Sequence, residues 1–310
     1  MTKKTMPHAG RPHESPLWRE YLYPEAVPEV LAILAERPAT ARIIAGGTDL
    51  VLQLKRGERI ASCLIDISRI PELHKIQAED GLIVVGAAAT HAEVASSPLL
   101  RSVAPLLADA AAEVGSPEIR NMATIGGNLV NAQPAADTAL ALLALGAEAE
   151  VVGVAGSRWV PLLELYQGPG ISAVDSTSEL LRGFRFRALS DQMGSAYRRL
   201  GKCKSIALPV LCAATIVELE KDLIASAAIS LGPVAPLPFR PHQAESWLVG
   251  RPANADTAAR AADLAQAEAE PRDSLLRCSR EYREERVAVL VKRTLEAAMS
   301  AAESRLGVIS

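Results

Sequence analysis

The sequence predicts an α+β protein built from two domains. Segments with helical and with strand periodicity are mixed along the first part of the chain, whereas strands followed by helices make up the second part. The polar segment Ser190-Asp191-Gln192 separates the two parts. A chain of 310 residues that is 49% hydrophobic can bury a core in each. We expect domains over residues 15–189 and 190–302, with tails at 1–14 and 303–310.

The elements of the first domain follow from apolar periodicity. Residues 25–37 place Val27, Val30, Leu31 and Leu34 on one helical face. Short apolar runs further along the chain have the length of strands, and residues 180–187 alternate between two faces. These patterns predict strands at 43–45, 82–86, 148–154 and 180–187, and helices at 99–114 and 137–145.

The second domain is expected to be a sheet covered by helices. Apolar runs predict strands at 207–218 and 223–231, followed by helices near 241–248, 256–269 and 280–302. The last helix carries an apolar stripe, which we assign to the core rather than to a partner surface. The stripe consists of Val287, Leu290, Val291, Leu295 and Ala298.

Composition argues against several partners and locations. A formal net charge of −3 gives no reason to expect nucleic-acid or membrane-surface binding. The longest apolar run, Ala139 to Ala147, is too short to span a bilayer. Residues 1–8 lack the apolar stretch of a secretory signal. The default expectation is a cytoplasmic protein without a membrane span.

Two diglycine turns are the strongest functional signal: Ala45-Gly46-Gly47-Thr48-Asp49 and Ala123-Thr124-Ile125-Gly126-Gly127-Asn128. A glycine pair approaches a ligand without a Cβ in the way, and successive backbone N–H groups can cradle an anion. Either turn alone marks a hairpin or helix cap more often than a site. Two turns that each carry a threonine and an aspartate or asparagine predict two loops around a pyrophosphate. Neither matches the Rossmann or P-loop pattern, so those nucleotide sites are not supported.

Both turns, the second with Ile119-Arg120-Asn121-Met122 before it, resemble the paired FAD motifs of the molybdenum hydroxylase flavoproteins. These are the FAD-binding medium subunits, or middle domains, of xanthine dehydrogenase, aerobic carbon monoxide dehydrogenase and 4-hydroxybenzoyl-CoA reductase. Further similar blocks occur at 21–24, 64–73, 86–91, 232–236 and 273–283. The resemblance implies a PCMH-type FAD-binding domain of two α/β subdomains, followed by an α+β domain like the C-terminal domain of the carbon monoxide dehydrogenase flavoprotein.

The resemblance also implies which residues bind FAD. The first pyrophosphate loop would act chiefly through main-chain N–H groups and comprises Ile43, Ile44, Ala45, Gly46, Gly47, Thr48, Asp49 and Leu50. The second, in which Thr124 and Asn128 offer polar side chains, comprises Thr124, Ile125, Gly126, Gly127 and Asn128. Asp137 matches an acid that accepts hydrogen bonds from ribose or ribityl hydroxyls of FAD. The alternative for Asp137 is a simple charge at a helix N-terminus.

Three more positions are assigned by the resemblance. Leu180 and Leu181 fit an apolar strand near the flavin ring. Tyr197 and Arg198 align with a motif that usually reads aromatic–lysine at the start of the second domain. Arg198 keeps the positive charge but binds through a planar fork rather than as a point charge, so its contact is left open.

The cofactor expected in this chain is one noncovalent FAD, because neither turn holds a histidine or cysteine for a covalent link. Cys63, Cys203, Cys212 and Cys278 are scattered and form no iron–sulfur ligand run, so we interpret them as buried free thiols. The resemblance therefore implies a small [2Fe-2S] subunit and a large molybdopterin-containing subunit as partners. A flavin links one-electron carriers to two-electron acceptors, so an external electron acceptor is also implied. No catalytic residue or metal ligand is assigned to this chain.

Two other functions are weighed against this one. A stand-alone FAD-dependent reductase of the same broad fold is disfavoured by the similarity of residues 190–302 to the family's C-terminal domain. A scaffold that has lost its flavin is disfavoured by the presence of both turns and Asp137. The substrate and the acceptor cannot be read from these residues.

Overall fold

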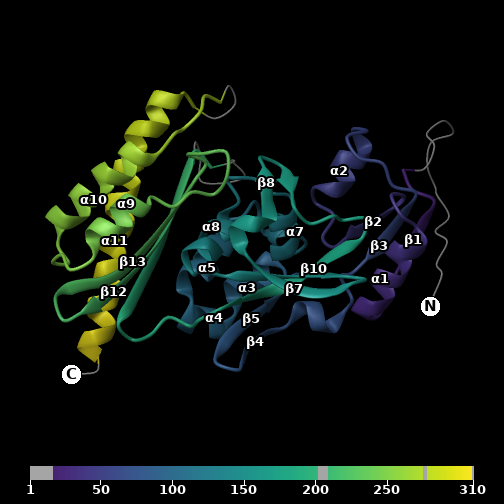
Figure 1. Cartoon of the computed structure of the whole chain (residues 1–310), viewed down its shortest axis with the longest axis horizontal. Helices are drawn as coiled ribbons and strands as arrows, with labels where there is room; N and C mark the ends of the chain where they lie inside the picture. Colours follow the sequence, from purple (N-terminus) through teal and green to yellow (C-terminus); the bar gives the residue numbers. More distant parts are fainter. Residues whose placement is uncertain (1–16, 202–208, 275–277, 309–310) are drawn as a thin grey trace.

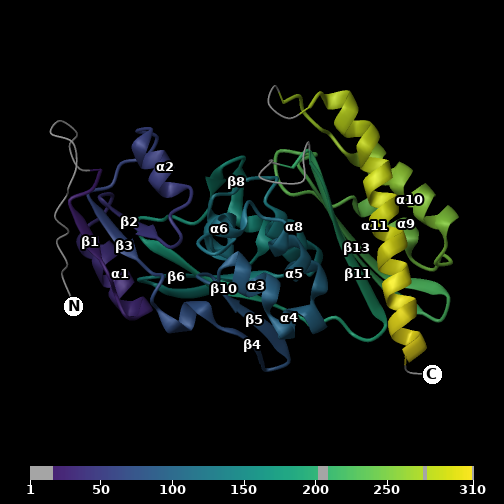
Figure 2. The ribbon, with the colours of Figure 1, turned by 180° about the vertical axis from the view of Figure 1, so that it is seen from behind.

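The computed structural model describes residues 17–201, 209–274 and 278–308, and arranges them as three units along one long axis (Figure 1). An N-terminal subdomain lies at one end, a five-stranded sheet with its helices lies in the middle, and a sheet backed by long helices lies at the other end. Figure 2 shows the same order from behind. The predicted tail at 1–14 falls outside the described residues.

The N-terminal subdomain is a small parallel sheet with the strand order β1-β3-β2. Its strands are β1 (Glu20–Leu22), β2 (Ala41–Ile44) and β3 (Cys63–Asp66). Helix α1 (Val27–Glu36) confirms the predicted amphipathic helix, although Ile33 rather than Leu31 is among its buried residues. The first diglycine turn joins β2 to the short helix α2 (Leu50–Lys55).

The central unit is an antiparallel sheet with the strand order β4-β5-β10-β6-β7. Its strands are β4 (Ile76–Glu79), β5 (Leu82–Gly86), β6 (Glu148–Gly153), β7 (Gly156–Pro161) and β10 (Glu179–Phe186). The α-helices of this unit are α3 (His91–Ser96), α4 (Pro98–Val103), α5 (Pro105–Ala112), α6 (Pro117–Arg120), α7 (Ile125–Val130) and α8 (Asp137–Ala144). Short elements complete it: the 3-10 helices η1 (Pro71–His74) and η2 (Leu162–Leu165) and the hairpin of β8 (Tyr166–Gly168) and β9 (Ile171–Ser172).

Two details of this unit differ from the sequence prediction. The helix predicted at 99–114 is two helices, because Pro105 lacks the N–H needed to continue α4 and begins α5 instead. The strict alternation predicted for 180–187 is wrong, because a register shift between Leu181 and Gly183 interrupts β10. As a result Leu181 and Phe184 pack in one core cluster, whereas Leu180 packs in the cluster of the N-terminal subdomain.

The C-terminal unit is an antiparallel sheet covered by helices on one face. Its strands are β11 (Met193–Leu200), β12 (Leu211–Glu220) and β13 (Leu223–Gly232), and its helices are α9 (His242–Leu248), α10 (Ala255–Glu268) and α11 (Arg280–Val308). All five residues of the predicted apolar stripe on α11 are buried in the core of this unit, as expected. Helix α11 continues past the predicted end at residue 302. Of the strand predicted at 207–218, residues 207 and 208 lie outside the described residues.

Helices α5 and α8 make the contact between the central and C-terminal units, α5 against β11 and α8 against β12 and β13. On α8, the backbone oxygen of Leu140 accepts a hydrogen bond from the Ser230 hydroxyl. The contact brings Asp137, at the first turn of α8, against β11 and β12. The fold thereby places an acidic side chain of the first domain among side chains of the second.

Two other features bear on the sequence predictions. Cys63 and Cys212 are buried free thiols, whereas Cys278 is partly exposed, and Cys203 falls outside the described residues. None of the helices described is both long and apolar enough to cross a membrane.

Candidate functional site

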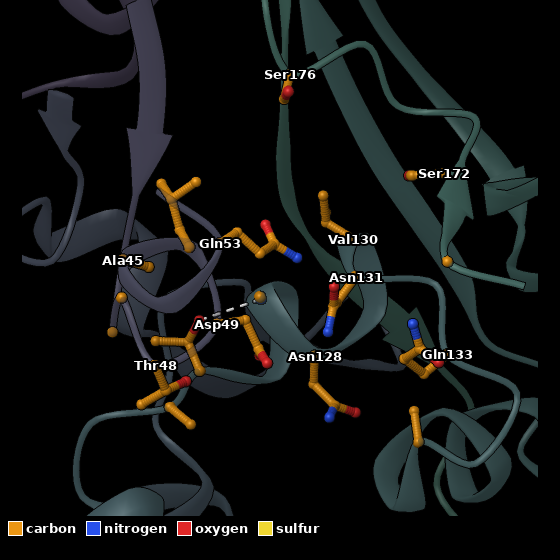
Figure 3. A pocket seen from close by; sticks show the side chains of 18 of the residues that line it. Ala45, Thr48, Asp49, Gln53, Asn128, Val130, Asn131, Gln133, Ser172 and Ser176 are labelled. Atoms are coloured by element: carbon orange, nitrogen blue, oxygen red, sulfur yellow. Dashed lines mark hydrogen bonds between the residues drawn. The ribbon is translucent and has the colours of Figure 1, made fainter. Parts of the chain in front are cut away.

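A cavity of about 1000 Å³ opens between the N-terminal subdomain and the central unit. One wall is formed by residues 42–50 with the following helix α2, and the opposite wall by residues 123–137 and 170–177. Arg199 of β11 and Pro209 add a third side from the C-terminal unit. Figure 3 shows Gln53 on one side and Asn128 and Asn131 on the other. The volume is at the upper end of the range found for small-molecule and cofactor sites.

The floor of the cavity depends on close backbone approach at two glycines. A Cβ on Gly46 would overlap the backbone oxygen of Met122, just before the second turn. A Cβ on Gly126 would collide with Ala87, at the end of β5. These two glycines are therefore structural, because they let the two turns and β5 meet backbone to backbone.

The other glycine of each pair also lines the cavity, but a Cβ on it would not overlap the protein backbone. Gly47 has φ +70°, a left-handed conformation that glycine adopts without strain. Gly127 has an ordinary helical conformation, and a Cβ built on it would meet only the Thr124 hydroxyl oxygen, at 3.0 Å. A side chain at residue 127 would therefore take up space on the cavity side without displacing the protein backbone.

The two turns differ in the backbone donors that they offer. The N–H groups of residues 46–49 donate no hydrogen bond to any acceptor among the described residues. In the second turn, by contrast, the N–H of Ile125 donates to Ala89 and that of Gly126 to Ala87, both at 2.9 Å. The N–H of Gly127 donates to the Thr124 hydroxyl at 3.1 Å. The expectation that both turns present free main-chain donors thus fits the first turn only, because the segment after β5 and the Thr124 hydroxyl accept the hydrogen bonds of the second.

In the second turn, a side chain offers the hydrogen-bond donor that the bonded main-chain N–H groups cannot. Asn128 lines the cavity, and its Oδ1 accepts a hydrogen bond of 3.0 Å from the Thr138 hydroxyl. This bond fixes the amide and leaves its Nδ2 group as a donor. The second wall can therefore bind an anion through a side-chain amide.

Asp137 is a buried carboxylate at the C-terminal side of the cavity, 7% exposed. Its Oδ1 accepts hydrogen bonds from the Tyr197 hydroxyl at 2.6 Å and from the Cys212 thiol at 3.6 Å. The guanidinium Nε of Arg199 lies 3.2 Å from the same oxygen. Burial raises the pKa of Asp137, while the Tyr197 hydrogen bond, the Arg199 charge and the Cys212 hydrogen bond lower it.

His91 lies at the cavity wall with its imidazole fully buried. Its two ring nitrogens have no hydrogen-bond partner among the described residues. Burial, with a smaller effect from the nearby Arg120 charge, lowers the pKa of His91 to about 4. The imidazole is therefore neutral at physiological pH.

The structure brings twelve of the residues predicted to bind the cofactor to one cavity. They are Ile43, Ile44, Ala45, Gly46, Gly47, Thr48, Asp49, Leu50, Thr124, Gly127, Asn128 and Asp137. The remaining six do not line it: Ile125, Gly126, Leu180, Leu181, Tyr197 and Arg198. For these six, contact with a cofactor stays a prediction.

The position of Arg198 has a simple structural reason. Side chains alternate along β11, so Tyr197 and Arg199 point inward while Arg198 is exposed. Arg199, which sequence reasoning passed over, is the arginine of this strand that lines the cavity. Its position two residues after a buried aromatic would have identified it, had 193–200 been recognised as a strand. Gln53, Asn131 and Gln133 were also missed, because their polar side chains carry no motif of their own.

These groups fit a dinucleotide such as FAD. Unbonded N–H groups and a fixed amide suit the two charges of a pyrophosphate, and a buried carboxylate suits the hydroxyls of a sugar or ribityl chain. No group of three or more histidine, cysteine or acidic side chains suited to a metal ion occurs in the described part of the chain.

Comparison with known proteins decides the family. Residues 16–186 match the model of the FAD binding domain in molybdopterin dehydrogenase, and residues 195–298 match that of the CO dehydrogenase flavoprotein C-terminal domain. The chain belongs to this flavoprotein family. The resemblance inferred from the diglycine turns, the fold class and FAD as the family's cofactor are thereby confirmed.

Individual relatives are similar to this flavoprotein over most of their own length. The carbon monoxide dehydrogenase medium chain of Hydrogenophaga pseudoflava is 32% identical over 90% of this flavoprotein and 96% of the relative. The nicotinate dehydrogenase FAD-subunit of Eubacterium barkeri is 31% identical over 77% and 82%. A chain of the Cu,Mo-CO dehydrogenase structure superposes with a TM-score of 0.85 at 29% identity, covering 91% of this flavoprotein and 97% of that chain. A chain of quinoline 2-oxidoreductase from Pseudomonas putida 86 gives the same TM-score at 28% identity, covering 95% and 100%.

The two kinds of glycine predict opposite effects of substitution by alanine. Gly46→Ala forces the two turns apart, so we expect the free energy of unfolding without cofactor to fall by about 1–3 kcal/mol. Gly127→Ala leaves that stability unchanged or slightly raised, since alanine favours the helix, but weakens FAD binding on the order of ten-fold. Chemical denaturation and flavin titration of both variants measure the two quantities. Unaltered FAD affinity in Gly127→Ala would show that residue 127 does not face the cofactor.

The buried imidazole predicts a specific loss of stability in acid. The folded chain keeps His91 neutral down to about pH 4, whereas the unfolded chain takes up the proton below about pH 6.5. The free energy of unfolding is therefore unaffected by His91 protonation above pH 6.5. As the pH falls from 6.5 to 4, it decreases by up to about 3 kcal/mol. Denaturation of the wild type and of His91→Phe across this range tests it. Parallel stability curves for the two proteins would contradict the assignment.

Proposed function

We propose that this chain is the FAD-binding electron-transfer subunit of a multi-subunit molybdenum hydroxylase. In this proposal, the FAD receives electrons from [2Fe-2S] clusters on a small partner subunit. It then passes them to an external acceptor. The substrate is oxidised on a large subunit that holds the molybdenum cofactor. The observation that carries the proposal is the cavity between the two diglycine turns, in a chain whose two domains both match this family.

The first turn takes the main part in binding the pyrophosphate. The N–H groups of residues 46–49 are free to donate, and Gly47 brings no side chain between them and the ligand. The Nδ2 group of Asn128 donates from the opposite wall. Asp137 accepts hydrogen bonds from hydroxyl groups further along the cofactor. Of the residues expected from the sequence, we retain as contacts the twelve that line the cavity.

A bound flavin supplies the exchange between single electrons and electron pairs. The chain's own residues bind it, fix its orientation and set the charges around it. Several charged side chains line the cavity, and burial raises the pKa of Asp49. The cations are Arg42, Arg56, Arg59 and Arg199, and the carboxylates are Asp49, Glu58, Asp137 and Asp175. These charges are the means by which this chain sets the reduction potential of its cofactor.

The names of the relatives support a subunit rather than a stand-alone reductase. They are a medium chain and an FAD-subunit, and the present chain spans 96% and 82% of their lengths. The C-terminal domain, which belongs to the same flavoprotein family, supports the same assignment.

The isolated chain is predicted to bind one FAD without a covalent bond and to oxidise no purine, aromatic or CO substrate. Acid precipitation should release all of the flavin, and chromatography should identify it as FAD. Addition of the [2Fe-2S] and molybdenum subunits should then give substrate-dependent reduction of the flavin, followed by its absorbance.

A complex assembled with flavin-free chain is the control for the electron path. Substrate should still bleach the [2Fe-2S] absorbance of that complex, but no electrons should reach the external acceptor. Turnover of a reducing substrate by this chain alone would instead establish a stand-alone reductase. A chain that binds no flavin would establish a scaffold.

A further inference from the structure

The environment of Asp137 is unusually one-sided. Three neighbouring side chains meet the same carboxylate oxygen, Oδ1: the Tyr197 hydroxyl and the Cys212 thiol donate hydrogen bonds to it, and the Arg199 guanidinium forms an ion pair with it. None of the side-chain hydrogen bonds or ion pairs among the described residues involves Oδ2. Since Asp137 lines the cavity, Oδ2, which receives no side-chain hydrogen bond from the described residues, is the oxygen available to a ligand.

The three side chains around Asp137 come from outside the FAD-binding domain. Tyr197 and Arg199 lie on β11, and Cys212 lies on β12 directly opposite Arg199 in the strand register. Tyr197 is buried and does not itself line the cavity. The C-terminal sheet thus holds a carboxylate that belongs to the first domain.

We propose that Tyr197, assisted by Cys212, is a positioning residue that locks the Asp137 carboxylate through Oδ1 and so presents Oδ2 to the hydroxyl groups of FAD. This inference rests on the proposed function, since it requires FAD in the cavity. It gives the C-terminal domain a role in cofactor affinity, although its tyrosine does not line the cavity.

The charges around this carboxylate determine its response to pH. They are Arg199 on β11 and, beyond it, Glu113 at the end of α5, 4.0 Å from the Arg199 guanidinium. Burial raises the pKa values of Tyr197 and Cys212 well above their ordinary values, so both keep their protons and act as donors. The Tyr197 hydrogen bond lowers the pKa of Asp137, and its removal therefore raises that pKa.

The test is Tyr197→Phe in the full chain, with FAD affinity measured by flavin fluorescence from pH 5 to 8. At pH 7 we expect FAD to bind about ten-fold more weakly, and the pH at which affinity declines on acidification should move upward. Tyr166→Phe is the matched control, because the Tyr166 hydroxyl is buried, has no partner among the described residues and lies off the cavity. That variant should bind FAD as the wild type does.

A double-mutant cycle separates positioning from a general structural effect. In an Asp137→Asn background there is no carboxylate to hold, so adding Tyr197→Phe should cost far less than ten-fold. Cys212→Ala, which removes the weaker donor to the same oxygen, should shift the pH dependence in the same direction by less. If Tyr197→Phe does not fold, Cys212→Ala still allows the pH dependence of FAD affinity to be measured.

Two results would overturn the inference and leave the proposed function intact. One is FAD affinity in Tyr197→Phe equal to that of the wild type at every pH. The other is an equal loss of affinity in the wild-type and Asp137→Asn backgrounds, with no shift along the pH axis. A wild-type chain that binds no FAD would overturn both.

Discussion

The site depends on the backbone contact between the two diglycine turns. At Gly46 the first turn lies so close to Met122 that no side chain fits, and at Gly126 the second turn lies equally close to Ala87. Three segments far apart in the sequence therefore meet without side chains between them. Helices α2 and α7 both start at this junction, which fixes the directions in which Gln53 and Asn128 project.

This contact also explains why the two walls bind an anion in different ways. The N–H groups of Ile125 and Gly126 hold the second turn against the segment following β5, and that of Gly127 bonds the Thr124 hydroxyl, so anion binding by this wall falls to a side chain in the proposed binding mode. The first turn makes its contact at the side-chain-free Gly46, and its N–H groups bond no acceptor in the described part of the chain. In the proposed binding mode, one turn is the structural support and the other binds the anion, although the two sequences look alike.

The cavity is completed by the C-terminal unit. Helix α8 belongs to the first domain but packs on β12 and β13, and this contact brings Arg199 to the cavity and Tyr197 to Asp137. If the proposed function holds, a flavin site shared in this way couples cofactor binding to the contact between domains. The match of the family models to both parts of the chain is consistent with one functional unit.

The sequence was informative where a residue type has a strong local effect. The diglycine turns, Asp137 and the apolar stripe of α11 were identified because glycine, a helix-starting acid and helical periodicity leave clear patterns. Arg199 and the free or bonded state of each N–H group were not identified. They depend on strand β11 and on contacts between segments about 40 residues apart, for which the local sequence carries no signal.

Residue-level amide hydrogen exchange, measured with and without FAD, tests the division of roles between the turns most directly. The account predicts that residues 125–127 are protected in the cofactor-free chain and change little when FAD is added. Residues 46–49 should exchange rapidly without FAD and become protected when it binds. Protection of 125–127 that appears only with FAD, or exchange at 46–49 that FAD does not slow, would contradict the account.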